Sequence, residues 1–271
     1  MTVRIIARLD MKPPAVIKPV HFEGYRRIGS PADVAARYCA QGVDELFCED
    51  VVASLFERDV QVDTMRAAAQ AGWIPVTLGG GIRTMADCET LFACGADKVA
   101  INTAAVRGDG SLIRAASRVF GPQSVVTHVT ARRDGDGWIA MTDMGRIESR
   151  WSALDWVREA EQLGAGEIIV SSVDRDGRRG GFDVTLLREA VRAVRVPVVA
   201  ASGAGSVEDV VTMVRAVRPS AVAIGSLLHY GMATVSDIRA ALAADDPGVH
   251  TPIGRPSLVA ERSTDGVRHA A

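Results

Sequence analysis

The segments GGGIRTMADCETLF (79–92) and SGAGSVEDVVTMV (202–214) share one pattern, a glycine-rich turn that leads into an amphipathic helix. A short apolar run follows each of them, in KVAINTAAV (98–106) and AVAIGSLLH (221–229). A third pair, DELFCEDVVAS (44–54) and GEIIVSSVDRDG (166–177), keeps nearly the same offset of about 120 residues. Repetition at one offset indicates an internal duplication, so the sequence predicts two similar halves.

Around these segments, short apolar runs alternate with helical patterns along the whole chain, for example over 31–42, 84–95, 151–164 and 206–217. The alternation favours an α/β fold, a (β/α)8 TIM barrel with a two-fold half-barrel repeat, over a doubly wound open sheet. We expect one barrel over 1–245, with half-barrels at about 1–122 and 123–245, and a loose extension over 246–271. The eight predicted strands are Val3–Leu9, Glu45–Cys48, Pro75–Leu78, Lys98–Ile101, Ser124–Val129, Glu167–Ser171, Pro197–Ala201 and Ala221–Ile224.

Composition narrows the classes of function. The 271 residues carry a net charge of −2, which gives no global attraction to nucleic acid. There is no long apolar run for a membrane span and no signal-peptide pattern, so we expect a cytoplasmic protein with neither nucleic acid nor membrane as partner. Four cysteines without a CxxC spacing indicate reduced, buried thiols, and we expect no metal and no cofactor.

Glycine-rich turns at the ends of predicted strands indicate phosphate binding. Glycine lets the backbone approach an anion, and the N–H groups at a helix N-terminus point at it. Because both halves carry such a turn, we expect a ligand with a phosphate at each end. Lys18 lies in the long segment after the first strand, 12–30, where a mobile cation could close over phosphate; a second long segment, 131–151, follows the fifth strand. The expected phosphate and substrate residues are Lys18, Gly80, Gly81, Asn102, Thr103, Asp176, Gly177, Gly203 and Ser226.

Carboxylates also follow predicted strands, and a carboxylate there can serve as a general acid or base. Asp10 emerges from the apolar run RIIARL, between Arg8 and Lys12, and is the favoured catalytic candidate. Asp50 could act in catalysis or hold a loop in place. Asp176, followed by Gly177, suits a turn that faces a ligand.

At the opposite end of the barrel, four charged residues each begin a strand, and they must gather around the bottom opening. Two cations and two anions there could form a closed ring. From the residues alone, such a ring is a stability network, because residues on this face normally serve the fold. The four are Arg4, Glu45, Lys98 and Glu167.

Together these residues resemble the HisF family, the cyclase subunit of imidazole glycerol phosphate synthase. The resemblance covers about Val3 to Ala243 and is most specific in RIIARLD, DELFCEDVVAS, LGGGIRT, GADKVAINTAAV and GAGEIIVSSVDRDG. It implies a lyase of histidine biosynthesis that pairs with a HisH-like glutaminase subunit as a heterodimer. The barrel would add ammonia to a phosphoribulosyl formimino carboxamide nucleotide with two phosphates, giving an imidazole and an aminoimidazole carboxamide product.

The resemblance also implies roles for individual residues. Asp10 would be a catalytic acid or base. Gly81, Asn102 and Thr103 would hold one phosphate, while Asp176, Gly177, Gly203 and Ser226 would lie around the other. Asp97 would lie at the glutaminase contact. Arg4, Glu45, Lys98 and Glu167 would form the gate through which ammonia enters the barrel from below, which revises the stability interpretation of that ring.

One position departs from the family pattern in a way that concerns chemistry. The family has a second catalytic aspartate at the end of strand five, where this chain has Thr130, and threonine cannot act as a carboxylate base. His128 lies two residues earlier, on the same face of the strand but one layer deeper. Arg8 stands where the family usually has a smaller residue, and Arg178 where it has a hydroxyl.

These departures leave several interpretations open. The chain could be a paralogue with altered lyase and cyclase chemistry, including amidation or amidine formation in surface-sugar or specialised metabolism. It could be an ordinary histidine-pathway cyclase that manages with Thr130. It could be a non-catalytic partner that activates a glutaminase, or a sugar-phosphate isomerase on a related barrel that binds two phosphates, although the bottom ring has no purpose in the latter.

Overall fold

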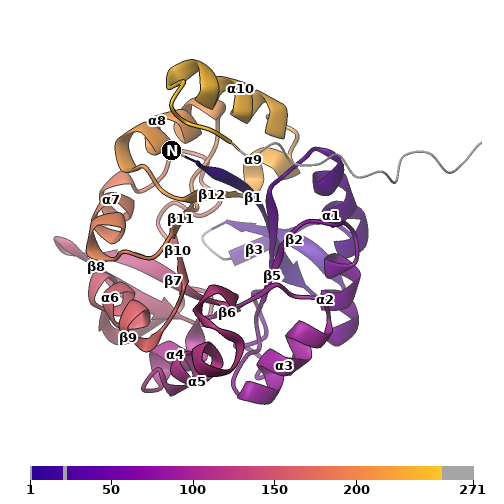
Figure 1. Cartoon of the computed structure of the whole chain (residues 1–271), viewed down its shortest axis with the longest axis vertical. Helices are drawn as coiled ribbons and strands as arrows, with labels where there is room; N and C mark the ends of the chain where they lie inside the picture. Colours follow the sequence, from indigo (N-terminus) through magenta and orange to yellow (C-terminus); the bar gives the residue numbers. More distant parts are fainter. Residues whose placement is uncertain (1, 21–22, 252–271) are drawn as a thin grey trace, which may run out of the picture.

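The structure, a computed structural model, describes residues 2–20 and 23–251. Within these residues, eight strands pair in parallel and close into a barrel. Closure occurs where β1 (Arg4–Lys12) pairs with β12 (Ala221–Ile224), with Arg4 opposite Ala221. Figure 1 shows the helices in an outer ring around the strands. The predicted (β/α)8 barrel is confirmed, and the open sheet is excluded because both ends of the strand order are paired.

All eight predicted strands overlap an observed one, because each apolar run is buried between the barrel interior and the helices. The other barrel strands are β4 (Glu45–Asp50), β5 (Val76–Gly79), β6 (Lys98–Ile101), β7 (Val125–Asp134), β10 (Glu167–Ser172) and β11 (Val198–Ala201). The helices are α1 (Pro31–Ala40), α2 (Val62–Ala69), α3 (Met85–Ala93), α4 (Thr103–Arg107), α5 (Ser111–Phe120), α6 (Ala153–Leu163), α7 (Val184–Ala193), α8 (Val207–Val217), α9 (Ser226–His229) and α10 (Val235–Asp245), with a 3-10 turn at Pro122–Ser124.

The duplicated segments adopt matching structures in the two halves. Helix α3 begins with a capping box in which Thr84 and Asp87 exchange side-chain and backbone hydrogen bonds, and α8 begins with the same box in Ser206 and Asp209. Before each box, a glycine adopts positive φ, +95° at Gly80 and +115° at Gly203. A Cβ at either position would collide with a backbone carbonyl oxygen, so these turns require glycine.

Side chains of alternate residues fill the barrel in layers, because successive residues of a strand point to opposite faces. On β1 the inward series is Arg4, Ile6, Arg8 and Asp10, from the bottom of the barrel to its mouth. The middle layer is apolar and contains Ile6, Phe47, Ala100, Val126, Ile169, Val199, Ala201, Ala221 and Ala223. Charged and polar layers therefore lie below and above an apolar one.

The two long segments over the mouth differ from the expected loops. Over 12–30 the chain forms β2 (Ala15–Val20) and β3 (Glu23–Gly29), and β2 pairs antiparallel with β1. Over 131–151, β7 continues to Asp134 and pairs with β8 (Gly137–Thr142), which pairs with β9 (Ile147–Ser152). The physical reason is that β1 and β7 both continue beyond the barrel, where their polar ends pair with an antiparallel strand.

Most of the predicted C-terminal extension, residues 252–271, lies outside the described residues. Before it, the chain runs beside the N-terminus, where the Val3 N–H donates to the His250 carbonyl at 2.9 Å. All four cysteines are free and buried, as predicted. No helix within 2–20 and 23–251 has the length and apolar character that a membrane crossing demands.

Candidate active site

The four charges at the strand starts form a closed ring across the barrel bottom, called here the bottom ring (Arg4, Glu45, Lys98 and Glu167). Arg4 bonds Glu45 at 2.8 Å and also pairs with Glu167. Lys98 lies 3.0 Å from Glu45 and 2.7 Å from Glu167. The Thr77 hydroxyl donates to Glu45 at 2.6 Å. Each cation thus bridges both carboxylates, and the ring predicted from the sequence is present.

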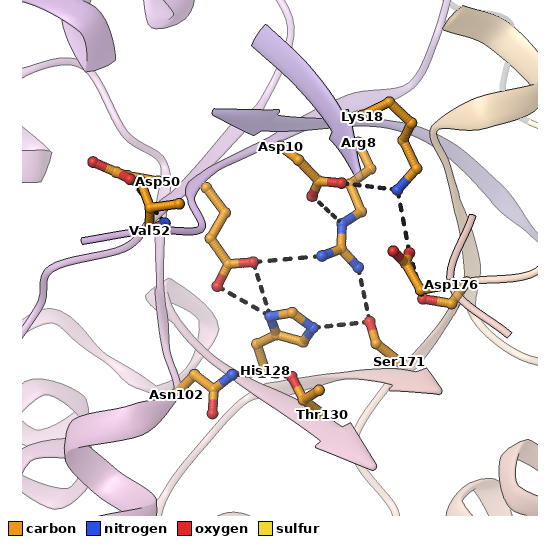
Figure 2. Close-up of polar contacts among 12 residues, drawn as sticks. Arg8, Asp10, Lys18, Asp50, Val52, Asn102, His128, Thr130, Ser171 and Asp176 are labelled. Carbon is orange, nitrogen blue, oxygen red and sulfur yellow. Dashed lines mark hydrogen bonds and ion pairs between the residues drawn. The ribbon is translucent and has the colours of Figure 1, made fainter. Parts of the chain in front are cut away.

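A second charged cluster lies above the apolar layer and is called here the mouth network (Arg8, Asp10, Lys18, Glu49, His128, Ser171 and Asp176). Asp10, at the centre, accepts from Arg8 Nε at 2.7 Å and from Lys18 Nζ at 3.0 Å. Lys18 also donates to Asp176 at 3.2 Å. Figure 2 shows Asp10 between the two cations. Lys18, expected in a mobile lid, is only 4 % exposed and is held between two carboxylates.

The charges of this network fix the protonation state of Asp10. Burial alone would raise the pKa of this carboxyl, but Arg8 and Lys18 outweigh burial and hold the pKa far below its usual range. The carboxylates in turn raise the pKa of Arg8 and of Lys18, although burial opposes both increases. Asp10 is therefore ionised at neutral pH, where it can accept a proton or orient a cation but has no proton to give.

The other half of the mouth network is a carboxylate, imidazole and hydroxyl chain that sequence reasoning missed. His128 Nδ1 lies 3.0 Å from Glu49 Oε1, and His128 Nε2 lies 2.8 Å from Ser171 Oγ. Arg8 donates to the same hydroxyl at 2.8 Å, and its Nη2 lies 3.7 Å from Glu49. Strand alternation could have found Glu49, because Glu45, Phe47 and Glu49 share the inward face of β4.

Thr130 occupies the end of the barrel portion of β7 and faces a neighbouring strand end. Its hydroxyl accepts from the Asn102 amide at 3.1 Å, and it is 3 % exposed. The Asn102 Oδ1 is buried and has no hydrogen-bond partner within the described part of the chain. A buried amide oxygen without a partner costs free energy, so a donor supplied by a ligand would be stabilising here.

A cavity of about 430 Å³ opens beside Thr130. It contains both glycines and both strand-end residues predicted for one phosphate, Gly80, Gly81, Asn102 and Thr103. Asp50, Glu49, Thr130 and His128 line it as well, and the cations Arg58, Arg83 and Arg107 lie on its wall. Sequence reasoning missed these arginines, of which Arg58 and Arg83 lie on loops and Arg107 ends α4, but their charge suits an anionic ligand.

Asp50 is committed to its own loop within this cavity. It accepts from the Val52 N–H at 3.1 Å and lies 3.4 Å from Arg58. Burial raises the pKa of the Asp50 carboxyl above its usual value, against the opposing effect of these partners. Both interpretations given by the sequence, catalysis and loop support, remain compatible with this position.

A second cavity of about 330 Å³ lies on the other side of Lys18 and contains Gly177 and Ser226. A narrow space of about 20 Å³ continues from it past Asp176 and Gly203. The structure therefore brings together the residues predicted for the second phosphate as well. Arg26 and Arg179, both missed by sequence reasoning, line the larger cavity and stack on Tyr230 at 5.9 and 5.6 Å.

The profile of the family described as "Histidine biosynthesis protein" matches residues 4–234, which is most of the chain. The chain belongs to this family.

Relatives within the histidine biosynthesis family are similar over nearly their whole length. A protein of Legionella pneumophila named imidazole glycerol phosphate synthase subunit HisF is 47 % identical over 208 residues, 76 % of this chain and 98 % of its own. The protein of that name from Bifidobacterium longum is 41 % identical over 89 % of this chain and 96 % of its own. The one from Gluconacetobacter diazotrophicus is 44 % identical over 93 % and 98 %.

Asp97, the residue expected at a partner contact, is exposed beside the ring and accepts from the Val76 N–H at 2.8 Å. No group of three metal-ligating side chains occurs within residues 2–20 and 23–251.

Proposed function

We propose that this chain is an ammonia-using synthase subunit of the imidazole glycerol phosphate synthase type, with lyase and cyclase chemistry. It would receive ammonia from a HisH-like glutaminase subunit and add the nitrogen to a substrate with two phosphates. One observation carries the proposal, the presence of two cation-lined glycine cradles at the barrel mouth, the second of which contains Lys18, the cation that donates to Asp10. A ligand with a phosphate at each end would span Asp10.

Each phosphate has a distinct set of partners in this proposal. Gly80, Gly81, Asn102 and Thr103 would hold one, and the backbone N–H groups at the start of α4 would face it. Gly177, Gly203 and Ser226 would hold the other, with Lys18 and Asp176 between that phosphate and the reacting atoms. The arginines around each cavity would contribute most to phosphate binding, since guanidinium groups bind oxyanions through paired N–H donors.

Ammonia would enter through the bottom ring. The neutral molecule is small and crosses an apolar layer at lower cost than ammonium, because an ion pays the larger desolvation penalty. The interior above the ring is lined by small and apolar residues such as Ala100, Ala221 and Ala223. This path would deliver nitrogen to the mouth network without passing through solvent.

A second candidate keeps the ammonia chemistry but changes the acceptor. It is favoured by the hydrogen bond between Asn102 and Thr130, which fills with neutral groups the place of the expected strand-five carboxylate. A paralogue for amidation or amidine formation on another phosphorylated substrate would have no need of that carboxylate.

Turnover with ammonium salt and the two-phosphate formimino nucleotide tests the proposal. Loss of substrate and release of the carboxamide nucleotide would be followed for the parent and for Thr130→Asp, together with equilibrium binding of the nucleotide. Robust turnover by the parent is the expected result. Tight binding without turnover, partly restored in Thr130→Asp, would favour the altered acceptor. Neither binding nor turnover, together with stimulation of a glutaminase, would contradict the proposal and favour the non-catalytic partner.

A further inference from the structure

The mouth network has more carboxylates than permanent cations. Arg8 and Lys18 share Asp10, and Lys18 also pairs with Asp176. Glu49 is a third carboxylate, 6 % exposed, whose short contact at 3.0 Å is to the His128 ring, while Arg8 lies farther away at 3.7 Å. A buried carboxylate needs a nearby positive charge or a proton. The His128 imidazole lies closer to the Glu49 carboxylate than the Arg8 guanidinium does.

Hydrogen-bond chemistry assigns the ring protons. The Glu49 carboxylate can only accept, so His128 Nδ1 carries a hydrogen and donates to it. Ser171 Oγ accepts from Arg8, which leaves the Ser171 hydroxyl hydrogen free to point at His128 Nε2. In the neutral ring Nε2 accepts this bond, and with one more proton Nε2 donates instead. Either bond joins the same two heavy atoms, His128 Nε2 and Ser171 Oγ, whose contact is drawn in Figure 2.

The pair also borders the cavity on the side where the strand-five carboxylate is missing. Glu49 and His128 line the same cavity as Thr130 and Asn102. On β7, His128 and Thr130 share the inward face, one level apart. Asp50 lines the cavity too, but the Val52 N–H and Arg58 hold it in its loop. Within the described residues, the Glu49 side chain contacts His128 and Arg8 across the barrel instead of its own loop.

We propose that Glu49, positioned and charge-balanced by His128, is the second proton-transfer group of this active site, in place of the carboxylate that Thr130 lacks. The inference rests on the proposed ammonia chemistry and names the residue that performs part of it. Glu49 is the catalytic residue in this proposal, because it lines the cavity. His128 is a positioning residue that also holds the transferred proton.

The step that needs this group can be written with its protons and electrons balanced. Ammonia attacks a substrate carbonyl carbon, one C–N bond forms, and the C=O electron pair moves to oxygen. One proton must then leave the nitrogen and one must reach the oxygen. Glu49 takes the proton from nitrogen and shares it with His128, and the same pair returns it to the oxygen, which becomes a hydroxyl. A second proton then moves from nitrogen to this hydroxyl by the same route, the C–O bond breaks, a C=N bond forms and the oxygen departs as water. Asp10 remains ionised during this step and holds the two cations in place.

The first test measures how many protons are taken up or released when the nucleotide binds, so it does not require turnover. The formimino nucleotide is bound to the full chain in the absence of ammonium, by calorimetry in two buffers of different ionisation enthalpy, which gives the protons taken up or released on binding. We expect His128→Gln and Glu49→Gln to change that number by a measurable fraction of one proton. Thr127→Val is the matched control, since Thr127 neighbours His128 on β7, is fully buried and makes no hydrogen bond through its hydroxyl in the described structure.

The second test asks for rescue in the turnover assay. Glu49→Gln and His128→Gln should each lower turnover by about 10²-fold or more, the usual contribution of a general acid or base. Adding Thr130→Asp to either variant should restore at least about tenfold, because it returns a carboxylate to the same cavity. A purely structural role gives no such rescue, since an aspartate at 130 does not rebuild the contacts of His128. Thermal unfolding of each variant checks that the fold persists.

Every result decides the inference separately from the proposed function. Turnover by the parent, with Glu49→Gln and His128→Gln no worse than Thr127→Val, overturns the inference and leaves the function standing. Loss of activity without rescue, with the proton number unchanged, also overturns it. If the parent itself does not turn over the nucleotide, the proposed function fails. The proton number then decides alone, a change supporting the pair and no change refuting it.

Discussion

The bottom ring and the mouth network are both systems of paired charges, one at each end of the same barrel, yet their charges balance differently. The ring has two cations and two carboxylates, and each cation contacts both carboxylates. The mouth network has two cations and three carboxylates, with an imidazole beside the third. A balanced ring needs nothing further, whereas an unbalanced network attracts a proton or a cation.

This difference matches what each end must do under the proposed function. A gate has to exclude ammonium and water at rest, and a neutral ring in which every charge is paired holds its shape without binding either. An active site has to exchange protons during each turnover, so its charge must be able to change by one at low cost. The apolar layer between the two ends keeps them electrically separate only in part, because low-dielectric surroundings screen charges weakly.

The largest expected effect comes from removing the shared carboxylate of the mouth network. Asp10→Asn leaves Arg8 and Lys18 buried with less negative charge, and breaking a buried pair in this way costs about 3–5 kcal/mol of unfolding free energy. Turnover should fall by about 10³-fold or more, because the reacting atoms lose both an oriented base and the cations it holds. Urea unfolding and the ammonium-dependent assay measure the two effects.

Glu148→Gln is the control for Asp10→Asn. Glu148 pairs with Arg132 on the exposed rim, where an ion pair contributes at most about 1 kcal/mol. If Asp10→Asn unfolds as easily as Glu148→Gln does, the two buried cations do not depend on Asp10, and the charge comparison between the two ends of the barrel is wrong.

A smaller effect is expected when the balance of the bottom ring is broken. Lys98→Met leaves two carboxylates with Arg4 alone, so the ring gains the excess negative charge that the mouth network already has. Such a ring would hold ammonium, and we expect glutamine-dependent turnover with a partner glutaminase to fall about tenfold. Turnover with external ammonium salt should stay within about threefold of the parent, since it bypasses the gate. Equal losses in both assays would show that the ring supports the fold and does not pass ammonia.

The barrel and the bottom ring could be predicted from the sequence because both rest on local patterns. Short apolar runs predict the strands. Four of the strands begin with a charged residue, namely Arg4, Glu45, Lys98 and Glu167. Parallel strands in a closed barrel bring all first positions to one end. No knowledge of register between distant strands is needed to reach that conclusion.

The mouth network could not be predicted in the same way, because it depends on side chains that meet across the barrel. Ser171 and Arg8 are distant in the sequence and meet only because both strands point them inward at one level. Asp50 was named as a candidate from the sequence because it ends its strand, but the inward-facing neighbour Glu49 was not named. The hairpins were also missed, since β2 forms only where β1 extends beyond the barrel to pair with it.

The smallest expected effect concerns His229, whose pKa is lowered by burial and by the charge of Lys18 in the mouth network. Burial, and then the Lys18 charge, lower the pKa of His229 from 6.5 to about 4, while its Nδ1 lies 2.6 Å from the Tyr38 hydroxyl. The folded pKa lies below the unfolded one, so the unfolded chain binds the proton first. The stability contribution is therefore fully present above pH 6.5 and is lost as pH falls towards 4.

Between those limits the parent should lose about 1–2 kcal/mol more unfolding free energy than His229→Gln, after allowance for partial solvent screening of this ring. Urea unfolding at several pH values across the window measures the slope for both. Tyr38→Phe is the companion variant, because it removes the hydrogen bond but keeps the burial and the Lys18 charge, so its slope should match the parent. Parallel slopes for the parent and His229→Gln would mean that neither burial nor the Lys18 charge lowers the pKa of the His229 imidazole. The positive charge of the mouth network would then be confined to the contacts of Asp10 and Asp176, as the charge of the bottom ring is confined to its four members.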